Sequence, residues 1–181
     1  MNETSPPDPA APGKAAAGPA VPDPSEHSRW RPLRLLQAAM DADIAAVYAE
    51  AQIGGLKPSY VMELLRLHSR GPMTITELAE SVQLTHSAVS QKVAALRAGG
   101  WVRTTTGTDA RSKKVTLTAK ATRIAGRLAA EWRATEAAIA ELEQEIPYPL
   151  SRVVTDIEEA LRRKSFHDRV AGKLAGDAAW R

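Results

Sequence analysis

The part of the chain that decides the fold runs from Thr74 to Thr118 and reads TITELAESVQLTHSAVSQKVAALRAGGWVRTTTGTDARSKKVTLT. Its first four residues have the form of a capping box, in which the Thr74 hydroxyl covers free amides and the Glu77 carboxylate reaches back. A short helix is therefore expected here. After a tight turn with Leu84 as its apolar anchor, Thr85 can cap a second helix. The pattern predicts a helix-turn-helix.

The second half of this stretch changes its hydrophobic period from 3.6 residues to 2. The pair Gly99-Gly100 closes the second helix, because glycine readily adopts the left-handed conformation of a helix C-terminal cap. Residues 101–104 and 113–117 then have the composition of strands, with a polar loop over 106–112 between them. A β-hairpin directly after the helix-turn-helix is the expected structure.

Helical patterns flank the hairpin and the helix-turn-helix on both sides. Apolar residues recur every three or four positions over 33–51, and a shorter pattern lies between Pro58 and Gly71. A long helix is expected from Thr118 to Pro147, and a last helix over 150–161. The fold class is therefore mainly α with a small β-hairpin.

Composition and charge limit what the protein can be. The chain has 181 residues and no cysteine, which excludes disulfides, thiolate metal sites and a cysteine nucleophile. Its net charge is only +3, but residues 85–114 hold six basic side chains against Asp109 alone. Such a local basic patch suggests a polyanionic partner, although a solvated basic face would show the same pattern.

The N-terminal segment differs in composition from the rest. Seven of the twelve prolines fall in the first 24 residues, with little apolar bulk, so roughly 1–28 is expected to be a disordered tail. The segment lacks the pattern of a secretory signal, and no apolar run approaches the ~20 residues of a membrane span. A cytoplasmic protein is therefore expected.

The order of these features, together with their residues, resembles the MarR family, the winged helix-turn-helix regulators named for multiple antibiotic resistance. The resemblance covers about 33–161 and is strongest over 74–118. No single motif is specific, but the ordered set is: Glu77-Leu78-Ala79, Leu84-Thr85 with Val89-Ser90, Gly100-Trp101-Val102, Asp109-x-Arg111 and Val115-x-Leu117-Thr118. Ala88 and Gln91 depart from the Thr and Arg that the family often has, so no operator sequence carries over.

The resemblance implies a homodimer in which the first and last helices of both protomers interlock. The chain would then consist of a disordered Pro/Ala-rich tail over 1–28 and a MarR-like domain over 29–181. Within that domain, 29–56 and 119–181 would be mainly dimerisation helices. Residues 57–118 would form the winged helix-turn-helix lobe that binds double-stranded DNA.

Candidate DNA contacts follow from how such a lobe meets the duplex. The N-terminal part of the second helix meets base edges in the major groove, which makes Ser87, Ser90 and Gln91 the candidate base readers. Arg111 at the wing tip is expected to enter the minor groove, oriented by Asp109 through a charge-assisted pair. Candidate phosphate contacts are Thr74, Thr85, His86, Lys92, Arg97, Arg103, Lys113 and Lys114.

The resemblance also implies a ligand, because the family commonly binds small aromatic or phenolic anions between the dimer body and the lobe. Candidate pocket residues are Met40, Ile44, Tyr48, Tyr60 and Trp132, and ordinary core packing is the alternative for each. No cofactor is expected. The four histidines are isolated and have no neighbour at the spacing of a metal site or a catalytic triad, so neither a metal site nor an enzyme is expected.

The expected function is therefore that of a sequence-specific DNA-binding transcriptional regulator. It would act as a homodimeric repressor on an inverted-repeat operator, modulated by a small molecule. The alternative is a winged-helix module that binds proteins through its basic wing and has no operator specificity.

Overall fold

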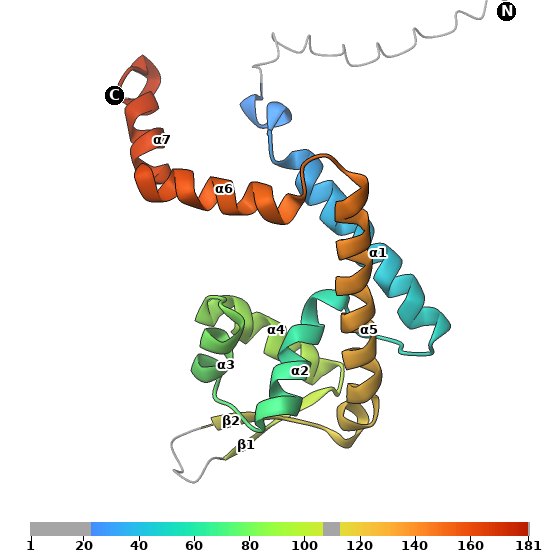
Figure 1. The fold of residues 1–181 in the computed structure, drawn as a ribbon. Coiled ribbons are helices and arrows are strands. Elements are labelled where there is room, and N and C mark those ends of the chain that lie inside the picture. The colour runs from blue at the N-terminus through green and yellow to red at the C-terminus, as the bar shows by residue number, and fades with distance from the viewer. Residues whose placement is uncertain (1–22, 107–112, 181) are drawn as a thin grey trace, which may run out of the picture. The chain divides into compact units, whose positions relative to one another are not determined.

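The computed structural model describes residues 23–106 and 113–180 of the chain (Figure 1). Its helices and strands are α1 Arg31–Glu50, α2 Val61–Arg70, α3 Ile75–Val82, α4 His86–Ala98, β1 Val102–Thr106, β2 Lys113–Leu117, α5 Ala119–Glu145, α6 Leu150–Arg163 and α7 Phe166–Leu174. Short 3-10 turns cover Pro24–His27, Pro58–Tyr60 and Ala178–Trp180. The predicted fold class, mainly α with one small hairpin, is confirmed. No described helix combines the length and the apolar composition needed to cross a membrane.

The chain divides into two compact units, 1–44 and 45–181, with the boundary inside α1. In the first unit, the side chain of Asp23 caps a 3-10 turn by accepting from the backbone N–H of Ser25 at 2.8 Å. Residues 24–27 of the expected tail are thus ordered by a local cap. Residues 1–22 lie outside the described part of the chain.

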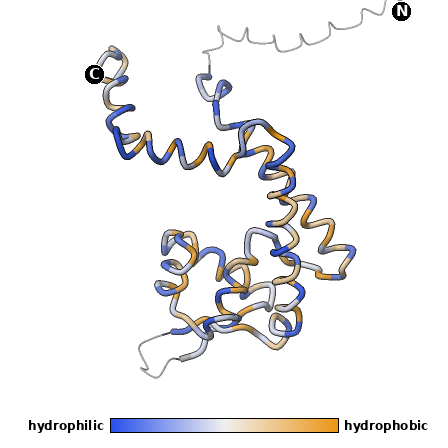
Figure 2. Tube along the Cα trace, viewed as in Figure 1, coloured by the Kyte–Doolittle hydropathy of each residue, from blue (hydrophilic) through white to orange (hydrophobic). Residues whose placement is uncertain are grey.

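The core of the second unit lies where α2, α3, α4 and the start of α5 pack around the hairpin. Leu64, Leu78, Leu96, Leu128 and Val115 are each at most 2% exposed, one from each of these elements. The apolar residues recur at helical spacing along each helix, which gives the alternating colours of Figure 2. Burial of this apolar surface holds the helix-turn-helix together.

The buried face of α2 differs from the expected one. The helical spacing predicts a buried stripe of Val61, Leu64, Leu65 and His68. The structure buries Val61, Leu64 and Leu67, leaves Leu65 half-buried and exposes His68. Glu63 is fully buried at 0% exposure, although glutamate is expected at the surface of a protein. The reason is a partner on another helix, described below.

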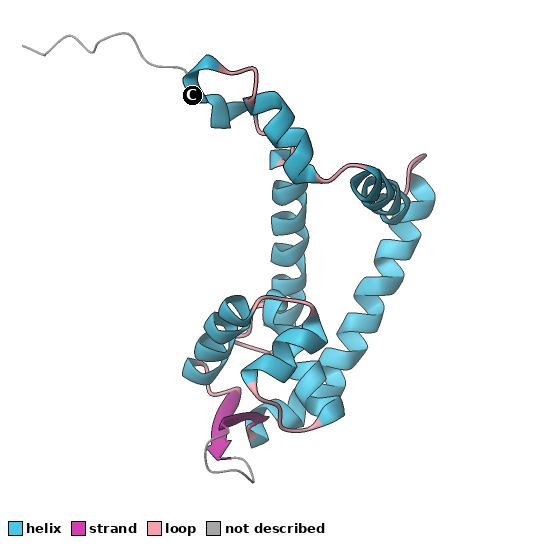
Figure 3. Ribbon diagram, turned by 90° about the vertical axis from the view of Figure 1, so that its left-hand side faces the viewer, coloured by secondary structure: helices cyan, strands magenta, loops and turns pink. Residues whose placement is uncertain are grey.

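The hairpin is antiparallel and has Val102 opposite Leu117 and Thr104 opposite Val115 (Figure 3). Its first strand extends to Thr106, two residues beyond the expected end. Met73 exchanges two backbone hydrogen bonds with Val115, at 3.1 and 2.7 Å, ahead of α3. The base of the hairpin is therefore fixed to the helix-turn-helix.

A further helix, α7, follows α6 and was not predicted from the sequence. Its N-cap Ser165 accepts from the backbone N–H of Asp168 at 3.1 Å. The pattern of a serine followed three residues later by an acid was the available signal, since it is typical of a helix start.

Candidate nucleic-acid interface

The first helix of the helix-turn-helix, α3, begins with the predicted capping box. The backbone N–H of Glu77 donates to the Thr74 hydroxyl at 3.2 Å, and the backbone N–H of Thr74 donates to the Glu77 carboxylate at 2.7 Å. Hydrogen bonding of the Glu77 carboxylate to Thr74, first to its backbone N–H and then to its side chain, lowers the pKa of Glu77 below its ordinary 4.5, and the nearby charge of Lys114 contributes less. This end of α3 is thus fixed by reciprocal contacts.

The turn between α3 and α4 is held by backbone geometry. Gln83 adopts a left-handed conformation, with φ of 55°, and caps the end of α3. The N–H of Leu84 donates to the carbonyl of Ala79 at 3.1 Å, and the Thr85 hydroxyl accepts from the N–H of Ala88 at 3.2 Å to start α4. Leu84 itself is 41% exposed, so it is not the apolar anchor that the sequence suggested.

Helix α4 presents a buried face and an open face. Val89, Val93 and Leu96 are buried against the lobe, as expected. Ser87 and Gln91, one helical turn apart, are exposed on the same side of the helix, and Ser90 beside them is half-buried. The three predicted base readers therefore lie on accessible or partly accessible surface of one helix, and His86 is exposed at its start.

A groove of about 440 Å³ separates α4 from the hairpin. Ser90 and Arg97 line it from the helix, and Thr104, Thr105 and Lys113 line it from the strands. Hydroxyls and cations from two elements thus meet across a hollow. Such groups can hold a phosphate of a nucleic-acid backbone.

The remaining predicted phosphate contacts fall into two groups. Arg97, Arg103 and Lys113 are exposed, and Lys114 is half-buried. Lys92 lies elsewhere: its Nζ donates to Glu63 Oε1 and to the carbonyl oxygen of Ser59, each at 2.7 Å. Because this ammonium is already neutralised inside the lobe, the structure separates Lys92 from the other expected phosphate contacts.

Comparison with known proteins agrees with this geometry. Residues 54–112, which span α2, the helix-turn-helix and the first strand, match the profile of the MarR family. This segment of the chain is therefore similar to the MarR family. The match is to a family of transcription regulators, which agrees with the expectation that the chain is not an enzyme.

Solved structures share the fold of this chain. A MarR protein from Peptoclostridium difficile is 16% identical, with a TM-score of 0.53 over 83% of this chain and 99% of that one. The MepR–DNA complex from S. aureus is 14% identical, with a TM-score of 0.56 over 75% and 97%. The transcriptional regulator SlyA is 13% identical, with a TM-score of 0.51 over 78% and 99%. Comparison with curated protein sequences finds no match.

Two predicted contacts of the MarR-family wing remain predictions. Asp109 and Arg111 lie outside the described residues, which resume at Lys113. The described part of the hairpin leads directly to them, since Thr106 pairs with Lys113 at the last described position of the ladder.

The five predicted effector residues fall in both units of the chain, and each unit is described by itself. Met40 and Ile44 belong to the first unit, where both are half-buried. Tyr48 is 2% exposed, and its hydroxyl donates to Glu131 at 2.6 Å, so it serves as core. Tyr60 is half-buried, with the ammonium of Lys57 located 5.8 Å from its ring centre. Trp132 lines a pocket in the second unit.

That pocket lies between α2 and α5 and has a volume of about 370 Å³. Its apolar wall includes Met62 and Leu65, and its polar groups come from Arg66, His68, Ser69 and Arg133. The Nε atom of Arg66 is buried and has no hydrogen-bond partner among the described residues. Sequence reasoning missed the α2 residues, although 62, 65, 66 and 69 have the spacing of a single helix face.

Proposed function

We propose that the protein is a sequence-specific regulator that binds double-stranded DNA as a homodimer on an inverted-repeat operator. The observation that carries this proposal is the open face of α4, where Ser87 and Gln91 are exposed next to a groove lined by Arg97 and Lys113. An α-helix of this kind fits the major groove, and its amide and hydroxyl side chains read base edges.

The cations around that face supply affinity. The candidate cations are Arg97 on α4, Arg103 on β1, and Lys113 and Lys114 on β2, and two of them, Arg97 and Lys113, line the groove beside α4. Contacts from such groups to phosphates fix the register of the protein and make binding strongly dependent on salt. Arg111, which lies in the sequence between the two strands, would extend this surface into the minor groove.

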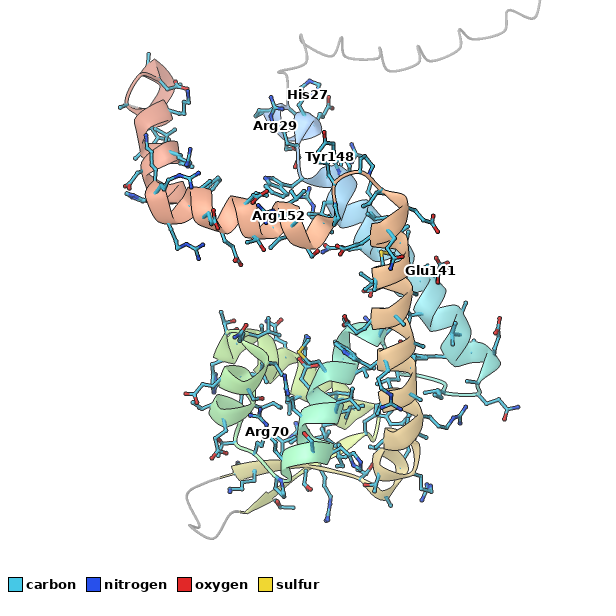
Figure 4. All side chains as sticks on the ribbon, in the orientation of Figure 1. His27, Arg29, Arg70, Glu141, Tyr148 and Arg152 are labelled. Atoms are coloured by element: carbon cyan, nitrogen blue, oxygen red, sulfur yellow. The ribbon has the colours of Figure 1, made fainter. Side chains whose placement is uncertain are left out.

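We propose that α1 and α6 bind a second copy of the chain. Leu150 and Val154 on α6 are 42% and 46% exposed, and Leu35 and Leu36 on α1 are 60% and 51% exposed. Large apolar side chains at this level of exposure mark surfaces that bury against a partner. The turn ahead of α6 adds Tyr148 at 77% exposure, with Arg152 paired to Asp156 on the helix itself (Figure 4).

The pocket between α2 and α5 is the proposed ligand site. Trp132 and Leu65 offer an apolar surface, and the unpartnered Nε of Arg66, together with Arg133, offers donors to an anion. A small aromatic carboxylate or phenolate satisfies both requirements, because its ring packs on the apolar wall and its anionic oxygen accepts from a guanidinium. Titration calorimetry with benzoate tests this site, and Arg66→Met should abolish the binding heat.

Repression follows if the bound dimer covers promoter DNA and the ligand releases it. A reporter gene placed behind a selected operator tests this part: expression should fall when the protein is present and recover on adding the ligand. Activation by the protein in the same assay would contradict repression and leave the DNA-binding proposal intact.

Selection of bound fragments from a random duplex pool tests the central proposal. The pool should become enriched in an inverted repeat with half-sites about one helical turn apart, because a two-fold dimer contacts two equivalent sites. Light scattering of the same protein should give the mass of a dimer, and Val154→Glu should lower that mass. Thr155→Glu adds the same charge to the neighbouring position of α6 and serves as its control. A winged helix that binds proteins instead would enrich no duplex.

A further inference from the structure

The ion pair between Glu63 and Lys92 joins α2 to α4 inside the lobe. Glu63 is fully buried, and its Oε1 lies 2.7 Å from Lys92 Nζ. The same ammonium donates to the carbonyl oxygen of Ser59, which belongs to the 3-10 turn leading into α2. One side chain of α4 is therefore held at two points, 29 and 33 residues earlier in the chain.

This arrangement is not needed for stability alone. Removing the Glu63 carboxylate from water is costly, even beside a Lys92 side chain that is 24% exposed, and a well-packed apolar pair of similar volume often stabilises a core equally well or better. Glu63 Oε2 is also buried and has no hydrogen-bond partner among the described residues, which adds to the cost. What the ion pair provides, and an apolar pair lacks, is direction: a charge-assisted hydrogen bond fixes both distance and angle.

Lys92 lies on α4 close to the predicted base readers, so the orientation of its ion pair affects the orientation of those residues. Lys92 follows Gln91 directly and lies five residues after Ser87, so it belongs to the same turns that carry the exposed readers. Successive residues of an α-helix are related by a rotation of about 100°. A tether that holds Lys92 inward against α2 therefore sets the rotation of α4 about its axis, and with it the direction in which Gln91 points.

We propose that Glu63 and Lys92 are positioning residues: the ion pair between the buried Glu63 and the half-buried Lys92 orients α4 so that its open face meets base edges in one register. This inference rests on the proposed function, and it assigns to Lys92 a role in specificity in place of a phosphate contact. The two roles differ in what they affect. A phosphate contact adds affinity for every sequence, whereas a positioning contact changes the ratio between operator and random DNA.

The double variant Glu63→Met/Lys92→Met tests the proposal, because it replaces the ion pair with flexible apolar side chains of similar length. Affinity is measured for the duplex selected from the random pool and for a scrambled duplex, each over a range of salt concentrations. The ratio of the two affinities should fall by at least about tenfold. The salt dependence on scrambled DNA should stay the same, since no phosphate contact is lost.

Lys113→Met is the matched control, because Lys113 is an exposed lysine beside the same helix. It should reduce the salt slope of the dimer by about 2, at roughly 0.9 per phosphate, and leave the affinity ratio nearly unchanged. If the double variant instead lowers the salt slope and leaves the affinity ratio nearly unchanged, Lys92 is a phosphate contact and the proposal is overturned. An unchanged ratio with an unchanged slope overturns it as well.

Circular dichroism on heating shows whether the double variant is folded. If it is not, Glu63→Gln takes its place, since the amide keeps the shape of the side chain and removes only the charge. The affinity ratio should then fall about threefold, and an unchanged ratio would contradict the proposal. If the wild-type protein itself selects no sequence, the proposed function fails and this inference fails with it. If the wild-type protein prefers the operator and the variant prefers it equally, only the inference about Glu63 and Lys92 is refuted.

Discussion

Trp101 donates its indole N–H to the carbonyl oxygen of Gly55 at 3.2 Å, and this bond joins the start of the hairpin to the loop before α2. The indole is 3% exposed and has the ammonium of Lys120 located 3.7 Å from its ring centre. It also lies against Gly99, the C-cap of α4: a Cβ placed on Gly99 would be 2.9 Å from Trp101 Cδ1. Position 99, between α4 and the hairpin, therefore has no room for a side chain.

Gly99→Ala should destabilise the protein by about 1–3 kcal/mol, because the added methyl forces Trp101 out of its position. Thermal unfolding measures the effect. Gly126→Ala is the control: Gly126 lies within α5 with nothing within 4 Å of the added Cβ, so alanine should stabilise the helix by about 0.5–1 kcal/mol. A rise in Tm for both variants would contradict the packing described here.

Gln91→Ala should relax the base preference at one position in each half-site. The lost amide contact is worth about 1–3 kcal/mol of discrimination when it pairs with adenine in two hydrogen bonds. Binding is measured on the selected operator and on variants changed at single positions. Gln144→Ala, at an exposed position of α5, should leave every affinity as it was. An equal loss on all sequences would make Gln91 a phosphate contact.

The salt dependence of operator binding should reflect four phosphate contacts from each protomer, made by Arg97, Arg103, Lys113 and Lys114. At about 0.9 per phosphate, the dimer should give a log–log slope near −7. Fluorescence anisotropy with labelled operator between low and moderate salt measures it. A slope shallower than about −2 would rule out this set of contacts.

Arg111→Ala should weaken operator binding more than the loss of any single phosphate contact, since an arginine in the narrow minor groove meets enhanced negative potential. Asp109→Ala should weaken binding to a smaller degree, because it removes only the group that orients the guanidinium. Gel-shift titration of both variants against wild type checks the order. Unchanged affinity for Arg111→Ala would show that the wing does not enter the groove.

Glu77→Gln should lower stability at neutral pH, with the difference from wild type vanishing in acid. The pKa of Glu77 is below 4.5 in the folded state, so the carboxylate contributes stability above pH 4.5 and loses that contribution as pH falls through its lowered pKa. Tm values of both proteins from pH 7 to pH 3 show whether the gap narrows. Glu80→Gln, which removes an exposed acid from the same helix, is measured beside it as the control.

Local signals in the sequence were sufficient for most of the fold. The capping box at Thr74 and Glu77, the cap at Thr85 and the glycine pair at 99–100 depend on residues close in the chain, so spacing alone predicted them. The change of period after Trp101 predicted the hairpin for the same reason. The cap of α7 carried a similar signal at Ser165 and Asp168, and it was missed because no long apolar stripe follows it.

The sequence by itself determined the order of helices and strands, the concentration of positive charge over 85–114 and the exposed face of α4, because each depends on neighbours along the chain. Only the tertiary structure decided where Lys92 points. Its charge matched every expectation for a phosphate contact, but Glu63 and Ser59, far away in sequence, hold it inside the lobe. The hydrophobic periodicity of the sequence cannot reveal an ion pair between two helices, because the burial of Glu63 depends on a partner that is distant in the chain.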